Sequence, residues 1–301
     1  MKSNLLYLSY RFIWWFISVL PSSVAYKLAT LTGKFIYSRN GKGVKRLRSN
    51  YQVVASNLSP SDLERLTKSG IISYWRYWCD TFRLNKWNKT QILNGVQLKN
   101  ENLLIDAVSS KRGCLVALPH AGNWDHAGAY FCQIGIPLTT VAEKLEPEKI
   151  FLKFLDYRQK IGMEILSHKE KTIPTLKERL SSGKLVALVA DRDLSKNGIE
   201  VEFFGKTAKM PAGPALLWLQ TGADFITAFV SYTSKGIHIQ FDQVSETVLQ
   251  QAKQLPDQTS AIKIITQEMA KNFERRIKES PVDWHMLQRI WIEPQEIHRN
   301  S

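Results

Sequence analysis

The chain has 301 residues, of which 44% are hydrophobic and 23% are charged, so it can bury a substantial core and is too apolar to be disordered. Its three cysteines, Cys79, Cys114 and Cys132, are odd in number and lack metal-ligand spacing, which excludes a disulfide framework and favours a reducing compartment. The formal net charge is +14, and the first fifty residues hold nine Lys or Arg and no acidic residue. This asymmetry indicates a polyanionic partner, either nucleic acid or anionic lipid. We expect a single domain over residues 1–301, because no repeat or linker divides the chain.

The apolar stretch from 5 to 20 predicts a helix that lies in a membrane interface or packs inside the protein. It is shorter than the ~20 apolar residues of a membrane span, carries Arg11 in its middle and is stopped by Pro21. No small-residue cleavage site follows it, so we do not expect a secretory signal. A second helical pattern at 25–37 leads into the basic stretch Gly41–Arg48. Basic residues directly behind an aromatic-rich apolar stretch favour a membrane surface over nucleic acid, although a helix packed only against its own protein stays possible.

Further helices are expected at 51–57 and 61–79, the second with Ser61 and Glu64 at the spacing of a capping box. An aromatic stripe at 74–82 is more typical of a core than of a binding surface, although it could also line a groove for an acyl chain.

From residue 113 onward, short apolar runs alternate with helical patterns. Strands are expected at 114–118, 137–142, 163–166 and 185–190, with helices at 123–133, 147–161 and 174–180 between them. This alternation predicts an α/β fold with a mostly parallel central sheet flanked by helices on both faces, preceded by membrane-associated N-terminal helices.

The last third of the chain predicts a loop at 200–214, a helix at 215–220 and two strands at 224–231 and 236–241 that form a hairpin. A long amphipathic helix is expected at 259–278. The tail at 283–291 is apolar enough to dock on the protein.

The stretch from Gly113 to Asp125 carries the strongest chemical signal. The predicted strand delivers His120 to its C-terminal end, Gly122 permits a tight turn, and Asn123 is a good N-cap for the helix that follows. Asp125, in the first helical turn, can then approach His120 at the edge where α/β proteins place their sites. In isolation such a spacing is more often an ordinary loop histidine with an acidic residue that complements the helix dipole.

Two further acidic residues, Glu143 and Asp191, follow predicted strands. Since the C-terminal ends of parallel strands meet at one edge of the sheet, we expect both to face the same crevice as His120. Arg158, on the helix at 147–161, and Arg192, next to Asp191, are candidates for binding substrate.

Several motifs occur in an order and spacing that cover most of the chain: His120-Ala-Gly-Asn-Trp-Asp125, Val141–Leu145, Ala190–Leu194, Val201–Gly205, Met210–Pro214 and Asp283–Gln288. Together with the basic stretch at 41–48, they resemble the lysophospholipid-acyltransferase-like group that contains the late lipid A acyltransferases. Within that group the chain is most similar to the phosphatidylinositol mannoside acyltransferases of actinobacteria.

The resemblance implies that His120 is the general base of acyl transfer and that the acidic residue at 191 pairs with it. Glu143 and Arg158 would line the site, with Arg158 near the headgroup or the pantetheine arm of the donor. The family often has Glu at the position of Asp191, one methylene longer. Either Asp191 or Asp125 could therefore orient the imidazole.

The expected reaction moves a fatty acyl group from acyl-CoA, a co-substrate, to a mannose hydroxyl of a glycolipid, with no metal and no other cofactor. Backbone N–H groups around Gly122 and Asn123 are candidates to bind the oxyanion. No Gly-x-Ser-x-Gly elbow is present, so no acyl-enzyme is expected. The expected location is the cytoplasmic face of the plasma membrane, as a peripheral protein that does not bind nucleic acid. The oligomeric state and the acyl-chain length are left open.

Three alternatives remain at this stage. A metal site built from His120, Asp125 and His126 lacks the spacing of known motifs. A lipid A acyltransferase that uses acyl carrier protein would employ the basic face as a docking site. A non-catalytic basic protein could bind membranes or nucleic acid.

Overall fold

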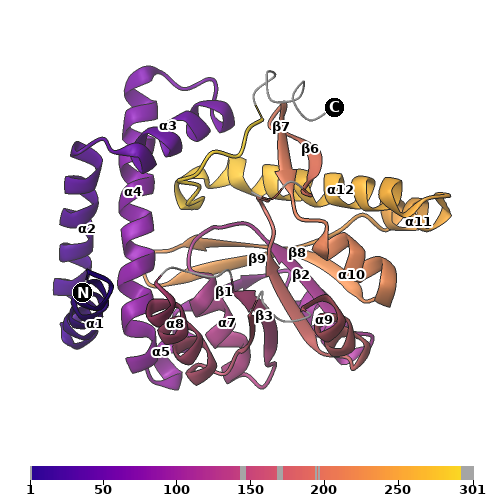
Figure 1. The fold of residues 1–301 in the computed structure, drawn as a ribbon, viewed down its shortest axis with the longest axis horizontal. Coiled ribbons are helices and arrows are strands. Elements are labelled where there is room, and N and C mark those ends of the chain that lie inside the picture. The colour runs from indigo at the N-terminus through magenta and orange to yellow at the C-terminus, as the bar shows by residue number, and fades with distance from the viewer. Residues whose placement is uncertain (1, 143–146, 168–171, 194, 196, 293–301) are drawn as a thin grey trace.

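The computed structural model describes residues 2–142, 147–167, 172–193, 195 and 197–292, with side chains from residue 7 onward. A seven-stranded sheet lies at the centre, with helices on both faces and an additional helical layer at the N-terminus (Figure 1). Its strands are β1 (Val96–Lys99), β2 (Cys114–Leu118), β3 (Leu138–Ala142), β4 (Glu164–Ser167), β5 (Leu185–Val189), β8 (Asp224–Tyr232) and β9 (Ile237–Gln243). The predicted fold class is therefore confirmed.

The strand order is β1-β9-β8-β2-β5-β3-β4, and all neighbouring pairs are parallel except β8 with β9, which form the predicted hairpin. β2 lies between β5 and β8 and is buried along its whole length. A strand that is covered on both faces has a continuous run of apolar residues, and this run predicted the strand from the sequence.

Side chains of β2 alternate between two hydrophobic cores, one on each face of the sheet. Leu115 and Ala117 belong to one core, whereas Cys114, Val116 and Leu118 belong to the other. The first core includes buried residues of α9 (Thr172–Ser181), α10 (Gly213–Thr221) and α12 (Gln258–Glu279), against which α11 (Glu246–Gln254) also packs. The second core includes buried residues of α5 (Lys89–Asn94), α6 (Asn102–Ser109), α7 (Trp124–Gln133) and α8 (Glu148–Lys160).

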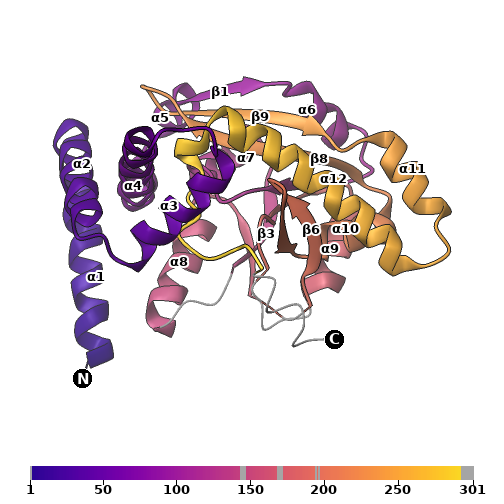
Figure 2. The same ribbon diagram turned by 90° about the horizontal axis from the view of Figure 1, so that it is seen from above.

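The N-terminal layer consists of α1 (Lys2–Val19), α2 (Ser22–Ser38), α3 (Lys42–Val54) and α4 (Pro60–Arg83). α1 and α2 form the outer edge of the molecule, with α4 on their inner side (Figures 1 and 2). A Cβ at Gly33 of α2 would lie 2.9 Å from the Cα of Ile72 of α4, so the missing side chain permits this close helix contact. Trp14 of α1 is buried against Phe82 and Phe154.

The outer surfaces of α1 and α2 expose a stripe of large apolar side chains. The α1–α2 stripe consists of Leu8, Phe12, Ile13, Trp15, Phe16, Val19, Val24, Leu28, Leu31 and Phe35. Exposed Lys27 and Lys34 lie on α2 beside it. Within the described part of the chain, none of the helices combines the length and apolar character that a membrane crossing requires.

Three details of the predicted elements were wrong. The helix expected at 51–57 is α3, which begins at Lys42 because Val44, Leu47 and Tyr51 form a buried face. The N-cap of α4 is Ser59 rather than Ser61, since the Ser59 side chain accepts from the Asp62 N–H.

The third error concerns the loop expected at 200–214. This segment is an antiparallel hairpin of β6 (Ile199–Phe203) and β7 (Lys206–Met210), which packs on α12. Val201, Phe203, Ala208 and Met210 are buried, whereas charged residues alternate with them on the other face.

The C-terminal segment docks on the protein, as predicted for 283–291. Two 3-10 turns, Leu84–Lys86 and Pro281–Asp283, complete the described helical elements. After the second turn, Trp284, Met286 and Ile290 are buried. The Asn50 side chain of α3 donates to the carbonyls of Met286 and Gln288 at 2.8 and 2.9 Å, which fixes the segment to the N-terminal layer.

Candidate active site

His120 and Asp191 meet because the two strands that precede them are neighbours. Leu118 of β2 pairs with Val189 of β5, and each site residue follows two positions later. The Ala190 N–H donates to the Leu118 carbonyl at 2.9 Å and continues the pairing past the strand ends. Nδ1 of His120 lies 2.5 Å from Oδ1 of Asp191. The expected convergence of these two residues at one edge of the sheet is therefore observed.

The turn after His120 depends on Gly122. Its φ is +55°, and a Cβ there would lie 2.5 Å from the carbonyl oxygen of Val230 on β8. Asn123 then caps α7 as predicted, because its side chain accepts from the His126 N–H at 2.9 Å.

Asp191 is 0% exposed, and N–H donors surround it. Its Oδ2 accepts from the His120 backbone N–H at 3.0 Å and from the Trp284 indole N–H at 2.8 Å, and its Oδ1 faces the imidazole. Burial acts to raise the pKa of Asp191, but the His120 charge and the hydrogen bonds from His120 and Trp284 outweigh it and lower that pKa. Asp191 is therefore a carboxylate at neutral pH.

The partner of Nδ1 determines the tautomer of His120. An ionised carboxylate can only accept hydrogen bonds, so Nδ1 carries a proton, and in the neutral ring the free lone pair is on Nε2. The His120 side chain is 26% exposed, and its ring packs edge-on to Trp124 at 5.7 Å. Nε2 can therefore act as a base toward a group that enters from outside.

Asp125 does not orient the imidazole in this structure. Its Oδ1 accepts from Nε of Arg158 at 2.7 Å, and its Oδ2 accepts from the Tyr77 hydroxyl at 3.2 Å. Asp125 is almost fully buried. Of the two candidates for orienting His120, Asp191 contacts the ring, whereas Asp125 pairs with Arg158.

Arg158 lines the site, but its guanidinium is largely buried in the pair with Asp125. Burial acts to lower the pKa of Arg158, and the Asp125 carboxylate outweighs this effect and raises it, so the pair is ionic. Arg192 follows Asp191 in the chain and is half-buried. Its charge acts to lower the pKa of the nearby Tyr74, but burial outweighs this effect and raises that pKa. Glu143 lies outside the described residues.

The proposed oxyanion donor at Gly122 was wrong. Its N–H donates to the carbonyl of Asp283 at 2.9 Å and is not available to a substrate. His126, a ligand of the alternative metal site, has its Nε2 3.0 Å from the Ile92 carbonyl, in the interior. Burial lowers the pKa of His126 to about 4, so the ring is neutral and donates there. Among the described residues, no three His, Cys, Asp or Glu side chains gather closely enough to hold a metal ion.

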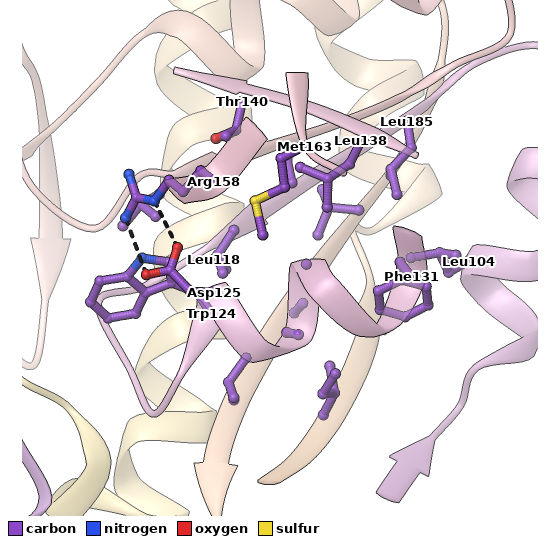
Figure 3. Close-up of a pocket in the computed structure, with 18 of the residues that line it drawn as sticks. Leu104, Leu118, Trp124, Asp125, Phe131, Leu138, Thr140, Arg158, Met163 and Leu185 are labelled. Atoms are coloured by element: carbon purple, nitrogen blue, oxygen red, sulfur yellow. Dashed lines mark hydrogen bonds and ion pairs between the residues drawn. The ribbon is translucent and has the colours of Figure 1, made fainter. Parts of the chain in front are cut away.

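An apolar pocket lies between the sheet and α7. Its cavity volume is about 90 Å³, which is below the range of roughly 300–1,000 Å³ that is usual for small-molecule sites. Leu118 and Val189, each two residues before a member of the pair, belong to its wall. Trp124, Asp125 and Arg158 lie at one end, and Leu104 and Phe131 lie at the other (Figure 3).

The aromatic stripe of α4 is core rather than pocket wall. Tyr77 and Phe82 are buried, and Tyr77 stacks on Trp124 with ring centroids 4.4 Å apart. This stacking contact supports the Trp124 ring, which lines the pocket.

The chain matches the model of the bacterial lipid A biosynthesis acyltransferases over residues 2–293. It belongs to this family. Its curated relatives include a phosphatidylinositol mannoside acyltransferase of Mycolicibacterium smegmatis, which is 33% identical over 289 residues, 95% of this chain and 91% of that protein. A second relative with the same name, from Mycobacterium tuberculosis, is 34% identical over 284 residues, 93% of this chain and 86% of that protein. The resemblance found in the sequence motifs is confirmed.

Two residues of this acyltransferase site were not singled out by the sequence. Trp284 bonds Asp191 from a segment 93 positions further along the chain, and Tyr77 bonds Asp125 from α4. The motif at 283–288 was the available signal for Trp284, but a motif does not say which residue its side chain reaches.

The buried Asp125–Arg158 pair makes the first prediction. Replacing one partner leaves an uncompensated buried charge, so Asp125→Asn and Arg158→Met should each lower the free energy of unfolding by about 3–5 kcal/mol. The double variant should lose less than the sum, as a double-mutant cycle by chemical denaturation would show. The exposed Asp156–Lys160 pair of the same helix, 2.7 Å apart, is the control and should contribute under about 1 kcal/mol. Additive losses at Asp125 and Arg158 would contradict the ionic pair.

Proposed function

We propose that this acyltransferase moves a long-chain fatty acyl group from acyl-CoA to a mannose hydroxyl of a phosphatidylinositol mannoside, with His120 as general base. The observation that carries the proposal is the His120–Asp191 pair, in which Asp191 fixes the tautomer that leaves Nε2 basic, at the ends of two strands whose Leu118 and Val189 line an apolar pocket. The names of the relatives supply the choice of acceptor.

The chemistry needs one base, because a thioester is already activated. Nε2 of His120 takes the proton of the sugar hydroxyl as its oxygen attacks the thioester carbonyl. Asp191 stabilises the imidazolium that forms without taking the proton itself. When the tetrahedral intermediate collapses, the carbon–sulfur bond breaks, and the imidazolium returns the proton to the departing CoA thiolate.

We assign the acyl chain to the apolar pocket, which at about 90 Å³ must widen to take a long chain. Its wall consists largely of Val, Leu, Ala, Phe and Met side chains, and burial of each methylene contributes about 0.8 kcal/mol. The Asp125–Arg158 pair at one end would lie near the polar part of the donor (Figure 3).

We assign the α1–α2 stripe to the membrane surface where both lipid substrates would be found. The stripe consists of large exposed apolar side chains, and α2 and α3 also expose the basic residues Lys27, Lys34, Lys42 and Lys45. This combination is typical of helices that bind in the interface of an anionic bilayer. The same arrangement supports a peripheral protein on the cytoplasmic face of the plasma membrane.

Acyl carrier protein remains the alternative donor, with lipid A as the acceptor. Parallel assays with acyl-CoA and acyl carrier protein thioesters, each with a phosphatidylinositol mannoside or a lipid A precursor, distinguish the two.

His120→Ala should abolish acyl transfer, with a loss of at least about 10³-fold in kcat, because the hydroxyl then lacks its base. Binding of the protein to lipid vesicles should remain, which separates this proposal from a non-catalytic lipid-binding protein. Transfer would be measured by the appearance of the acylated glycolipid in a mass spectrum. A variant that acylates at the wild-type rate would refute the assignment of the base.

Gly128 and Met163 should set the length of the acyl chain. A Cβ at Gly128 would lie 2.1 Å from Cε of Met163, so Gly128→Ala forces Met163 to move within the pocket that both residues line. The variant should favour shorter donors and Met163→Ala longer ones, by about fourfold in kcat/KM per methylene. The measurement is kcat/KM over a series of acyl-CoA donors, and an unchanged profile in both variants would place the chain elsewhere.

Phe12→Ser with Trp15→Ser should weaken binding to vesicles that contain an anionic phospholipid by about 100-fold or more, since each side chain contributes roughly 1.5–3 kcal/mol when buried. Both residues are exposed, so folding should not change. Ile105→Ser on α6, also exposed, is the control outside the stripe. Equal binding of the double variant and the control in a sedimentation assay would remove the stripe from the membrane interface.

A further inference from the structure

Residues 283–285 pair with the backbone of residues 120–122, the loop that follows β2 and carries His120. Ala121 and Trp284 form an antiparallel bridge. The Gly122 N–H donates to the Asp283 carbonyl at 2.9 Å, and the His285 N–H donates to the His120 carbonyl at 2.8 Å. We name residues 283–285 the C-terminal strap. The strap holds the backbone on both sides of Ala121.

The strap is itself anchored on two other elements. The Asp283 carboxylate accepts from the Tyr232 N–H at the end of β8, at 2.9 Å, and from the Ser73 hydroxyl of α4, at 2.7 Å. The Tyr51 hydroxyl donates to the Trp284 carbonyl at 3.2 Å. The position of the Trp284 ring is thus fixed relative to the sheet and to the N-terminal layer.

The indole of Trp284 reaches the one carboxylate on which the base depends. Oδ2 of Asp191 accepts from Trp284 at 2.8 Å and from the His120 backbone N–H at 3.0 Å. Turning the plane of the carboxylate away from this orientation would break both bonds. Two fixed donors on Oδ2 therefore keep Oδ1 directed at the imidazole Nδ1, 2.5 Å away.

We propose that Trp284 is a positioning residue for acyl transfer: its indole N–H fixes the orientation of the Asp191 carboxylate and so the tautomer and direction of His120. Trp284 is fully buried and does not touch a substrate, so its effect passes through Asp191. This inference rests on the proposed function, in which His120 is the base. It also requires that the C-terminal segment is docked for His120 to act as a base.

The chain offers a matched control. Trp291 packs on Phe203, as Trp284 does, with ring centroids 5.7 and 6.1 Å from that ring. The Trp291 Nε1 is buried but has no hydrogen-bond partner among the described residues. Exchange of tryptophan for phenylalanine at either position removes part of an indole ring that packs near Phe203, and only at 284 does it remove a bond to Asp191.

The test compares Trp284→Phe with Trp291→Phe in the full-length protein, by steady-state acyl transfer from acyl-CoA over a range of pH. Trp284→Phe should lower kcat by about 10- to 100-fold with a small change in KM, the cost of one hydrogen bond to a charged group. Trp291→Phe should stay within about twofold of the wild type.

The pH profile separates positioning from a general loss of stability. A donor to a carboxylate lowers its pKa, so removing the indole N–H raises the pKa of Asp191. Because activity requires ionised Asp191, Trp284→Phe should lose activity at a higher pH than the wild type as the pH is lowered. Trp291→Phe should lose it at the same pH as the wild type. Should Trp284→Phe fail to fold, benzothienylalanine at 284 keeps the ring shape and replaces the N–H by sulfur.

Either 284 variant would overturn the inference if its kcat and pH profile matched those of Trp291→Phe. His120→Ala, run in parallel, keeps the two proposals apart. If His120→Ala is inactive while the 284 variants behave like the control, the proposed function stands and the role of Trp284 falls. If His120→Ala is active, the proposed function itself falls.

Discussion

The site depends on one buried negative charge. Removing a carboxylate from water costs several kcal/mol, and Asp191 has no exposed surface with which to recover hydration. The charge is stable there because N–H groups from the His120 loop and from Trp284 donate to it. These donors belong to segments that are far apart in the sequence. The requirement to satisfy one carboxylate therefore brings together the end of β5, the loop after β2 and the C-terminal strap.

Two acidic side chains at this edge of the sheet have separate partners. Asp191 faces the imidazole, whereas Asp125 is engaged by Arg158 and Tyr77. Because Arg158 neutralises Asp125, the end of the pocket carries no net charge from this pair, and an apolar chain can lie next to it at lower cost. In the proposed reaction, the charge of Asp191 stabilises the imidazolium that forms during proton transfer. Different partners thus give two chemically identical groups different roles.

Much of this arrangement was predictable from the sequence, and the limits have physical causes. β2 and β5 were found because strands buried on both faces are continuous apolar runs, and the residues after them had to meet at one edge. The hairpin at 199–210 was missed because Gly205 and the alternating charges of β6 and β7 also suit a loop. The choice between Asp125 and Asp191 could not be made, since it depends on where Arg158 lies in space. Trp284 could not be assigned to Asp191 either, because local periodicity says nothing about a contact across 93 positions.

One helix, α8, joins the apolar outer layer to the pocket beside the candidate site. Lys153 of α8 lies over the Trp14 ring of α1, with Nζ 4.8 Å from the ring centroid. Arg158 follows five positions later, about 140° around the helix, and points inward to Asp125. Phe154, between them in the sequence, packs on Trp14 as well. α1 is therefore connected through packed side chains to the helix that supplies the ion pair beside the pocket. If the α1–α2 stripe binds lipid as proposed, α8 links the layer at the lipid surface to the pocket that we assign to the acyl chain.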